Sequence, residues 1–160
     1  MSVQSIAVIG VGQMGSGIVQ VAAQANFKVV CIEANQAKLD KALGKIDAAL
    51  GKLVEKGKID ADAKAAALSR VQGSVDLNTV KDCDLIIEAI TENVEEKVAL
   101  FKKLDEICKA DAILSSNTSS ISITKLASST KRPEKVIGMH FFNPVPLMKL
   151  LEIIRAVQTN

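Results

Sequence analysis

The first thirty residues join a short apolar segment to a helix through a turn that contains three glycines. Residues Ser5–Ile9 (SIAVI) are mostly apolar and rich in Ile and Val, which is typical of a buried strand. The apolar residues of Gln13–Ala25 then recur every three or four positions, which is helical periodicity. A second apolar run, Lys28–Ile32, follows and ends at Glu33. A strand, a helix and a strand in this order predict two parallel strands with the helix packed across them.

The same alternation continues along the chain. After the second strand, Leu and Ile residues repeat at spacings of four and three up to Leu53, Gly57 gives a stop signal, and Asp60 can cap a further helix. This pattern predicts a helical hairpin that projects from the sheet, although an ordinary long surface helix would give the same spacing. Further strands are expected at 71–75, 85–90, 112–114 and 136–140, with helices at 94–108 and from about residue 122.

Strands that alternate with helices predict an α/β fold with a doubly wound, mainly parallel sheet and helices on both faces. The length of 160 residues fits one domain, and 48% hydrophobic with 24% charged residues is typical of globular proteins. Ligands of such sheets bind beyond the carboxyl ends of the strands. The unusual residues of this sequence fall at those ends, which are 10–15, 33, 89–92, 115–119 and 140–143.

Composition excludes several classes of function. Twenty Lys and Arg against eighteen Asp and Glu, with only 2% aromatic residues, give neither the basic field nor the stacking side chains of nucleic-acid-binding proteins. Three scattered cysteines favour reduced thiols and no metal site. No apolar run reaches the roughly 18 residues of a membrane span, and the amino terminus lacks the pattern of a signal peptide. We therefore expect a cytoplasmic protein that binds neither nucleic acid nor membrane nor metal.

The turn GVGQMG places Gly10, Gly12 and Gly15 in a GxGxxG pattern between a strand and a helix. Gly10 can make the tight turn, Gly12 can admit a diphosphate to the free N–H groups of the helix start, and Gly15 allows close packing. Glu33 ends the next strand, where a carboxylate can bind the adenosine ribose and repel a 2′-phosphate. The combination predicts a Rossmann-type site for NAD. A purely structural glycine turn and the S-adenosylmethionine site of a methyltransferase stay open.

The only histidine, His140, lies in the segment GMHFFNPVPLMKLLEII with two of the three prolines. Glu152 is flanked there by apolar residues, where an unpaired buried carboxylate would be costly. Pro144 and Pro146 break the chain and can turn it back, so that the two side chains meet. An imidazole oriented by a carboxylate is suited to act as a general base. The alternatives are a histidine that is merely packed, and an edge strand with Glu152 facing water.

These segments together resemble the NAD-binding domain of the 3-hydroxyacyl-CoA dehydrogenases, including the bacterial 3-hydroxybutyryl-CoA enzymes. The matching stretches are AVIGVGQMGSGIVQVAA, IIEAITENVEEKVALFKKLD, SSNTSSISIT and GMHFFNPVPLMKLLEII. The resemblance implies an NAD-dependent oxidoreductase of fatty acid β-oxidation or butanoate metabolism that acts on a (3S)-3-hydroxyacyl-CoA. Short-chain and zinc alcohol dehydrogenases are disfavoured, because the chain has no tyrosine and no Cys–His cluster.

The resemblance also implies a role for each site residue. His140 would take the hydroxyl proton of the substrate, Glu152 would orient His140, and Ser119 would hydrogen-bond the substrate oxygen. The helical hairpin would help to hold coenzyme A, with Lys56 as the candidate contact. The residues implied along the cofactor are Gln13 and Met14 at the glycine turn, and Ala89, Ile90, Glu92, Lys97 and Asn117 near the ribose and the nicotinamide.

In the family that the chain resembles, a helical carboxyl-terminal domain completes the acyl pocket and forms a homodimer, and residues 1–160 contain no counterpart of it. We therefore expect these residues to be the NAD-binding domain alone. Two functions stay open. The chain is either the catalytic cofactor domain of a 3-hydroxyacyl-CoA dehydrogenase, or an NAD-binding module without independent catalysis that is truncated from, or docks with, a separate helical domain.

Overall fold

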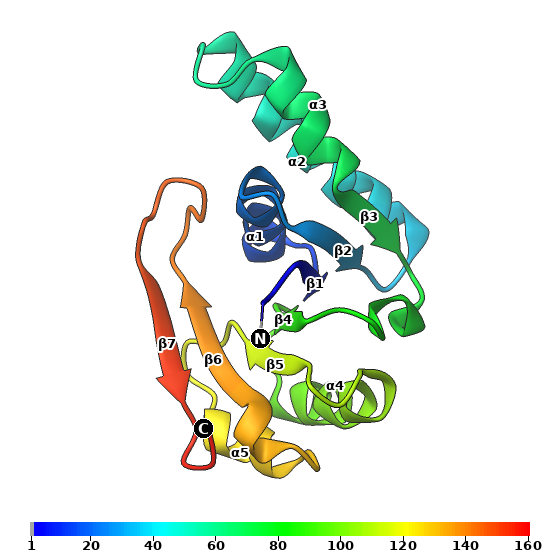
Figure 1. The fold of residues 1–160 in the computed structure, drawn as a ribbon, viewed down its shortest axis with the longest axis vertical. Coiled ribbons are helices and arrows are strands. Elements are labelled where there is room, and N and C mark those ends of the chain that lie inside the picture. Colours follow the sequence, from blue (N-terminus) through cyan, green and yellow to red (C-terminus); the bar gives the residue numbers. More distant parts are fainter. Residues whose placement is uncertain (1) are drawn as a thin grey trace.

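The computed structural model describes residues 2–160, which form a seven-stranded sheet (Figure 1). Across the sheet the strand order is β3-β2-β1-β4-β5-β6-β7. The first six strands are parallel, and β7 runs antiparallel to β6. The order of those six is that of the doubly wound Rossmann fold. The strands are β1 (Ser5–Ile9), β2 (Lys28–Ile32), β3 (Val71–Ser74), β4 (Leu85–Glu88), β5 (Ile113–Ser116), β6 (Val136–Phe141) and β7 (Leu151–Arg155).

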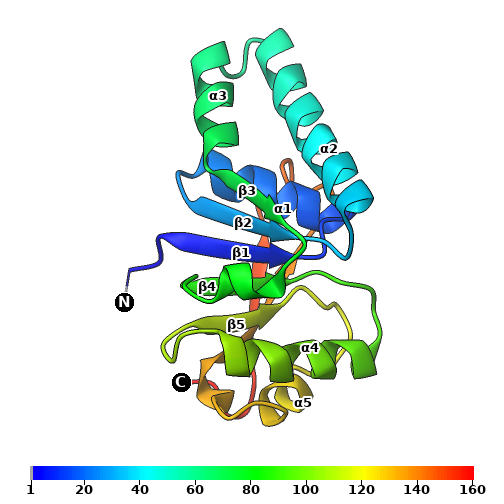
Figure 2. The same cartoon turned by 90° about the vertical axis from the view of Figure 1, so that its right-hand side faces the viewer.

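Helices cover both faces of the sheet, as the sequence predicts (Figure 2). Helices α1, α2 and α3 lie on one side, and α4 and α5 lie on the other. No helix of residues 2–160 combines the length and the apolar character that crossing a bilayer requires. The helices are α1 (Gln13–Gln24), α2 (Gln36–Glu55), α3 (Ala61–Ser69), α4 (Val94–Ile107) and α5 (Ile123–Ser128), with short 3-10 helices at Leu77–Val80 and Pro133–Lys135.

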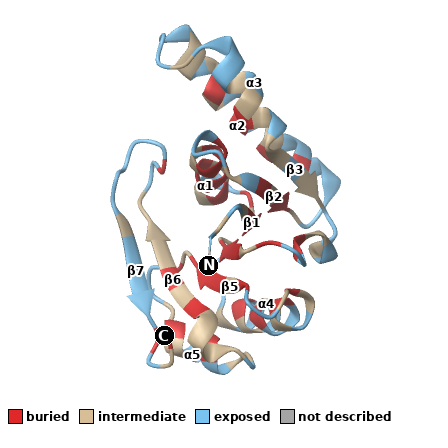
Figure 3. Cartoon of the chain, viewed as in Figure 1, coloured by how far each residue is buried: buried red, intermediate tan, exposed pale blue. Residues whose placement is uncertain are grey.

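Strand β1 shows why an unbroken apolar run is needed at the centre of this sheet. Ile6 and Val8 join a buried cluster with α1 and α2, whereas Ala7 and Ile9 join a second cluster with α4 and α5. Side chains alternate between the two faces of a strand, and both faces here are covered. The sheet therefore separates two hydrophobic cores, and the buried residues follow its central strands (Figure 3).

The predicted helical hairpin is formed by α2 and α3, which project beyond the sheet (Figure 2). Asn35 caps α2 by accepting a hydrogen bond from the Lys38 N–H at 2.9 Å. Gly57 ends the turn with a φ of +69°, which glycine adopts without strain. Asp60 then caps α3 by accepting from the Ala63 N–H at 2.7 Å. The stop and start signals in the sequence therefore act where they were expected.

The segment after β6 turns back as an antiparallel hairpin, so that β7 forms an edge of the sheet. The expectation that Glu152 is buried is wrong, because β7 is an edge strand with its side chains largely in solvent. The Glu152 side chain is 52% exposed and Ile153 is 56% exposed. Val145 in the connecting loop packs on α1, where a Cβ at Gly17 would come within 2.8 Å of the Val145 Cβ.

Candidate active site

The three glycines of the turn after β1 have different surroundings. Gly10 has a φ of +86°, and a Cβ there would lie 2.8 Å from the carbonyl oxygen of Ala89. A Cβ at Gly15 would lie 1.9 Å from the carbonyl oxygen of Gly10. By contrast, a Cβ at Gly12 would meet no atom within 4 Å. The fold itself requires glycine at the first and third positions, and the second leaves open space at the start of α1.

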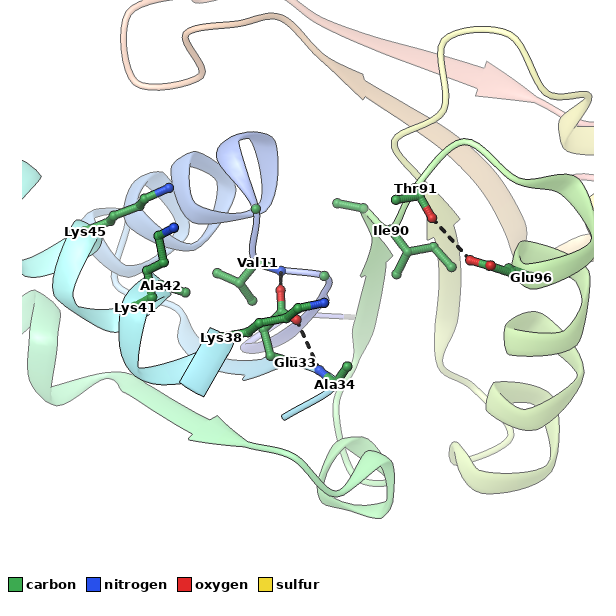
Figure 4. Close-up of a pocket in the computed structure, with 13 residues that line it drawn as sticks. Val11, Glu33, Ala34, Lys38, Lys41, Ala42, Lys45, Ile90, Thr91 and Glu96 are labelled. Atoms are coloured by element: carbon green, nitrogen blue, oxygen red, sulfur yellow. Dashed lines mark hydrogen bonds between the residues drawn. The ribbon is translucent and has the colours of Figure 1, made fainter. Parts of the chain in front are cut away.

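A cavity of about 510 Å³ lies beside this turn (Figure 4). Its walls come from the glycine turn, the end of β2, the first turns of α2 and the segment after β4. These are the carboxyl ends of neighbouring parallel strands, where doubly wound sheets bind ligands. Of the cofactor residues implied by sequence, five line this cavity: Gly10, Gly12, Glu33, Ala89 and Ile90.

Glu33 is held at the edge of the cavity by two backbone groups (Figure 4). Its Oε1 accepts a hydrogen bond from the Val11 N–H at 2.7 Å, and its Oε2 accepts from the Ala34 N–H at 3.1 Å. An ionised carboxylate has about four lone-pair sites, so both oxygens can still accept from hydroxyl groups. The open space at Gly12 and this fixed acceptor fit the diphosphate and the ribose of a dinucleotide.

Three lysines in the cavity wall were missed by the sequence analysis. Lys38, Lys41 and Lys45 come from one side of α2, and their side chains reach toward the cavity (Figure 4). Their spacing in the sequence could have indicated this, because each lysine directly precedes a residue of the buried stripe Leu39, Ala42 and Ile46, so the three lysines lie on the same side of the helix. Thr91 and Glu96 also line the cavity and were missed.

His140 and Glu152 meet directly, as their segment predicted. The two residues are opposite each other in the register of β6 and β7, and the His140 Nδ1 lies 3.0 Å from the Glu152 Oε2. The ring of Phe142 packs against the imidazole with centroids 4.6 Å apart. A contact between side chains that are 21% and 52% exposed adds little stability, so its clearest effect is to fix the imidazole orientation. The other ring nitrogen, Nε2, is then the one available to a ligand.

The segment after β5 brings two further predicted residues to the same edge of the sheet. The Asn117 N–H donates to the Glu88 carbonyl oxygen at 2.8 Å, and the Asn117 Oδ1 accepts from the Phe141 N–H at 2.9 Å. Asn117 therefore joins the end of β4 to the residue after His140. Ser119 is exposed two positions further along.

Lys97 does not reach the cavity surface, in contrast to the contact that the sequence resemblance implies. Its side chain is 1% exposed, and its Nζ lies 2.5 Å from the Glu88 Oε2. Glu88 is fully buried, and the sequence analysis missed it although an acid within the apolar run LIIEAI is itself a signal. Burial raises the pKa of the Glu88 carboxyl, and the hydrogen bonds from Lys97 and Ser116 oppose that shift.

The remaining predicted residues lie outside the cavity wall. Gln13 and Met14 begin α1, and the Gln13 Nε2 donates to the Asn143 Oδ1 of the loop between β6 and β7 at 3.3 Å. Glu92 lies just before α4. Lys56 is the residue that follows α2 as its carboxyl-terminal cap, in the connection between α2 and α3. Within residues 2–160, no group of three or more His, Cys, Asp or Glu side chains is placed to hold a metal ion.

The glycine turn, the fixed carboxylate and the strand order define a Rossmann-type dinucleotide-binding domain, with a histidine–carboxylate pair on the same sheet. Residues 5–160 match the family described as "3-hydroxyacyl-CoA dehydrogenase, NAD binding domain". The chain belongs to this family, and the cofactor of the domain is NAD.

Similar proteins agree with this assignment. The chain is 54% identical to a probable 3-hydroxybutyryl-CoA dehydrogenase of Deinococcus radiodurans, over 96% of this chain and 55% of that protein. It is 54% identical to the 3-hydroxybutyryl-CoA dehydrogenase of Clostridioides difficile, over 97% of this chain and 55% of that protein. A crystal structure of 3-hydroxybutyryl-CoA dehydrogenase from Escherichia coli K12 superimposes with a TM-score of 0.98 at 42% identity, covering 100% of this chain and 34% of that one. The chain spans about half the length of the curated relatives it matches.

Proposed function

We propose that this chain is the catalytic cofactor domain of an NAD-dependent dehydrogenase for (3S)-3-hydroxyacyl-CoA, such as 3-hydroxybutyryl-CoA. The observation that carries the proposal is the 3.0 Å contact between His140 Nδ1 and Glu152 Oε2, on the same sheet whose strands β1, β2 and β4 end at the cavity. The names of the relatives support the substrate class. A cytoplasmic location and a role in fatty acid or butanoate metabolism belong to this proposal.

In the proposed reaction, the Nε2 of His140 takes the proton from the C3 hydroxyl of the substrate. The O–H bond breaks, a C3=O double bond forms, and the C3–H bond breaks with its electron pair. NAD, when bound, supplies the acceptor for that hydride. Glu152 accepts a hydrogen bond from Nδ1–H, which orients the ring and stabilises the imidazolium that forms. The Ser119 hydroxyl donates a hydrogen bond to the substrate oxygen.

The cofactor is proposed to lie along the cavity edge. The N–H groups at the start of α1 would bind the diphosphate, because a helix amino terminus carries unpaired donors and a partial positive charge. Glu33 would accept from the ribose hydroxyls, and Asn117 would face the nicotinamide end. Lys56 remains the candidate for a contact with coenzyme A on the helical hairpin.

A second candidate function is favoured by one observation on β7. This edge strand and its flanking loops expose large apolar side chains, which usually mark a surface that another element covers. We propose that a separate helical domain docks here and that residues 1–160 alone bind NAD without turning over substrate. A full-length homodimer would follow from the same family resemblance. The exposed apolar residues of this region are Leu147, Met148, Leu150, Ile153, Ile154 and Val157.

One pair of measurements separates the two candidates. NADH binding is followed by the fluorescence of the nicotinamide, and turnover is followed by NADH oxidation with acetoacetyl-CoA. Binding with turnover supports the dehydrogenase, and binding without turnover supports the module. A folded chain that does not bind NADH would contradict both.

A further inference from the structure

A buried ion pair beneath the cavity wall takes no part in the proposed proton and hydride transfers. The Lys97 Nζ donates to both carboxylate oxygens of Glu88, at 2.7 Å and 2.5 Å. The same Nζ lies 3.3 Å from the Ile90 carbonyl oxygen, and the Ile90 N–H donates to the Glu88 Oε2 at 3.1 Å. The pair thus binds both backbone polar groups of Ile90, a residue that lines the cavity.

The pair also reaches the segment after β5, by two routes. On one route, the Ser116 hydroxyl donates to the Glu88 Oε1 at 2.9 Å and accepts from the Thr118 N–H at 3.2 Å. On the other, Lys97 lies 3.6 Å from the Glu92 Oε1, and the Thr118 hydroxyl donates to the Glu92 Oε2 at 2.7 Å. The five residues form a closed ring that runs Glu88, Lys97, Glu92, Thr118, Ser116 and back to Glu88.

Thr118 connects this ring to the loop that carries Asn117 and Ser119. Besides its bond to Glu92, the Thr118 hydroxyl oxygen accepts from the N–H groups of Ser120 at 3.3 Å and Ile121 at 3.0 Å. Thr118 is buried, so its side chain acts on the site only through its neighbours. Four of the five links in the ring are hydrogen bonds and the fifth is the Lys97–Glu92 ion pair, and such a connected network fixes the relative positions of its members.

We infer that Thr118 is a positioning residue, which holds Asn117 and Ser119 in register with the cavity wall at Ile90 through the ring rooted in Glu88. The inference rests on the proposed function, in which those two residues face the nicotinamide and the substrate oxygen. The adenosine end of the cofactor, at Glu33 and Gly12, is outside the ring. Loss of the Thr118 hydroxyl should therefore affect the two ends of the cofactor differently.

The test compares Thr118→Val, which removes the hydroxyl at nearly constant volume, with Thr118→Ser, which keeps it. Each variant is titrated with NADH and with ADP-ribose, which lacks the nicotinamide. Thr118→Val should weaken NADH binding by about 3- to 10-fold, the worth of one or two hydrogen bonds. Its affinity for ADP-ribose should stay within about twofold of the original chain, and Thr118→Ser should bind both ligands normally.

Amide hydrogen exchange without ligand gives a second readout that does not depend on cofactor binding. The amides of Ser120 and Ile121 should exchange faster in Thr118→Val than in Thr118→Ser. Equal exchange in the two variants, or an equal loss of affinity for NADH and ADP-ribose, would overturn the positioning role. If the original chain binds neither ligand, the proposed function fails, and the exchange comparison still decides whether Thr118 holds the loop.

Discussion

Gly10, Gly12 and Gly15 share one turn, yet only two of them are needed by the protein backbone. Gly10 and Gly15 have backbone atoms where a side chain would be, whereas Gly12 faces open space. The sequence pattern predicted these separate uses because each position of the motif has its own geometric reason. The pattern could not predict which residue packs against each glycine. Ala89, which lies closest to Gly10, is distant in sequence.

Gly12→Ala should therefore mainly weaken cofactor binding, whereas Gly15→Ala should mainly destabilise the fold. A methyl group at position 12 costs the fold less than about 1 kcal/mol but intrudes on the diphosphate. We expect NADH affinity to fall by roughly 5- to 100-fold, as for an overpacking cost of about 1–3 kcal/mol. Gly15→Ala should instead lower the free energy of unfolding, because its Cβ would overlap the Gly10 carbonyl oxygen. Urea unfolding and NADH titration of both variants measure this contrast, and equal stability of the two would contradict it.

At His140, the expected change concerns the rate and not the affinity for the cofactor. His140→Gln should leave NADH binding almost intact. In the complete dehydrogenase it should reduce turnover by roughly 10²- to 10⁴-fold, which is the usual effect of losing a general base. Steady-state kinetics with acetoacetyl-CoA and NADH measure it. Glu152→Gln serves as the companion variant, because it keeps the side-chain shape while removing the charge that orients the ring. A normal rate for His140→Gln would end its assignment as the base.

Among the elements, the helices and the six parallel strands lie within a few residues of their expected positions, whereas β7 was expected only as an alternative. The strand expected at 85–90 ends at Glu88, because the chain leaves the sheet there to line the cavity at Ala89 and Ile90. Glu152 was treated as either buried beside His140 or exposed on an edge strand. In the structure Glu152 is exposed on the edge strand and still pairs with His140, since directly opposite side chains of antiparallel strands project from the same face. Local sequence cannot show that β7 has no strand on its other side.

The start of β4 is tied to β1 by Asp84, and this link predicts a pH dependence of stability. The Asp84 carboxylate accepts from the N–H groups of Gln4 and Ser5 and forms an ion pair with Lys109 at 2.6 Å. The hydrogen bond from Lys109, followed by those from the backbone, holds the pKa of Asp84 well below its usual range. A lowered folded-state pKa contributes stability above the unfolded-state value of about 4. That contribution is lost as the pH falls from about 4 toward the lowered pKa.

Asp84→Asn should thus be less stable than the original chain by about 1–2 kcal/mol at pH 7, the worth of hydrogen bonds to a charged group. The difference should shrink at pH 3, where the carboxyl of the unfolded original chain is largely protonated while the folded-state carboxylate is still ionised. Urea unfolding at both pH values measures it. Asp82→Asn, at an exposed neighbouring position, is the matched control and should show a smaller difference. A gap that stays constant between pH 7 and pH 3 would rule out the proposed linkage.

For the molecule as a whole, the distribution of apolar surface is the feature that the sequence could not reveal. The composition fits a globular domain, and the periodic segments predicted two covered faces. Leu150, Ile153 and Ile154 of LLEII are instead exposed on β7 and just before it, where an edge strand can keep apolar side chains for a surface that another element covers. The cavity lysines and the buried pair of Glu88 and Lys97 were missed for a related reason. Whether these side chains line a cavity or pair with each other depends on which strands are neighbours in the sheet.

If a helical domain docks on β7, Ile153→Asp should weaken that association while leaving residues 1–160 folded. Ile153 is 56% exposed, so the substitution costs little stability in the isolated chain. Titration with the helical domain of a full-length family member, with NADH oxidation as the readout, measures the loss. Val75→Ser is the control, because Val75 is also exposed but follows β3 at the opposite edge of the sheet. Unchanged association of Ile153→Asp would contradict docking on this strand.

The pairing of His140 with Glu152 across two antiparallel strands has a consequence for how such proteins diversify. A single-residue insertion within either strand would send one partner to the opposite face, because side chains alternate along a strand. Length changes that keep the pair together are therefore confined to the connecting loop at 142–150, which evolution or an engineer can remodel while His140 and Glu152 stay opposite each other.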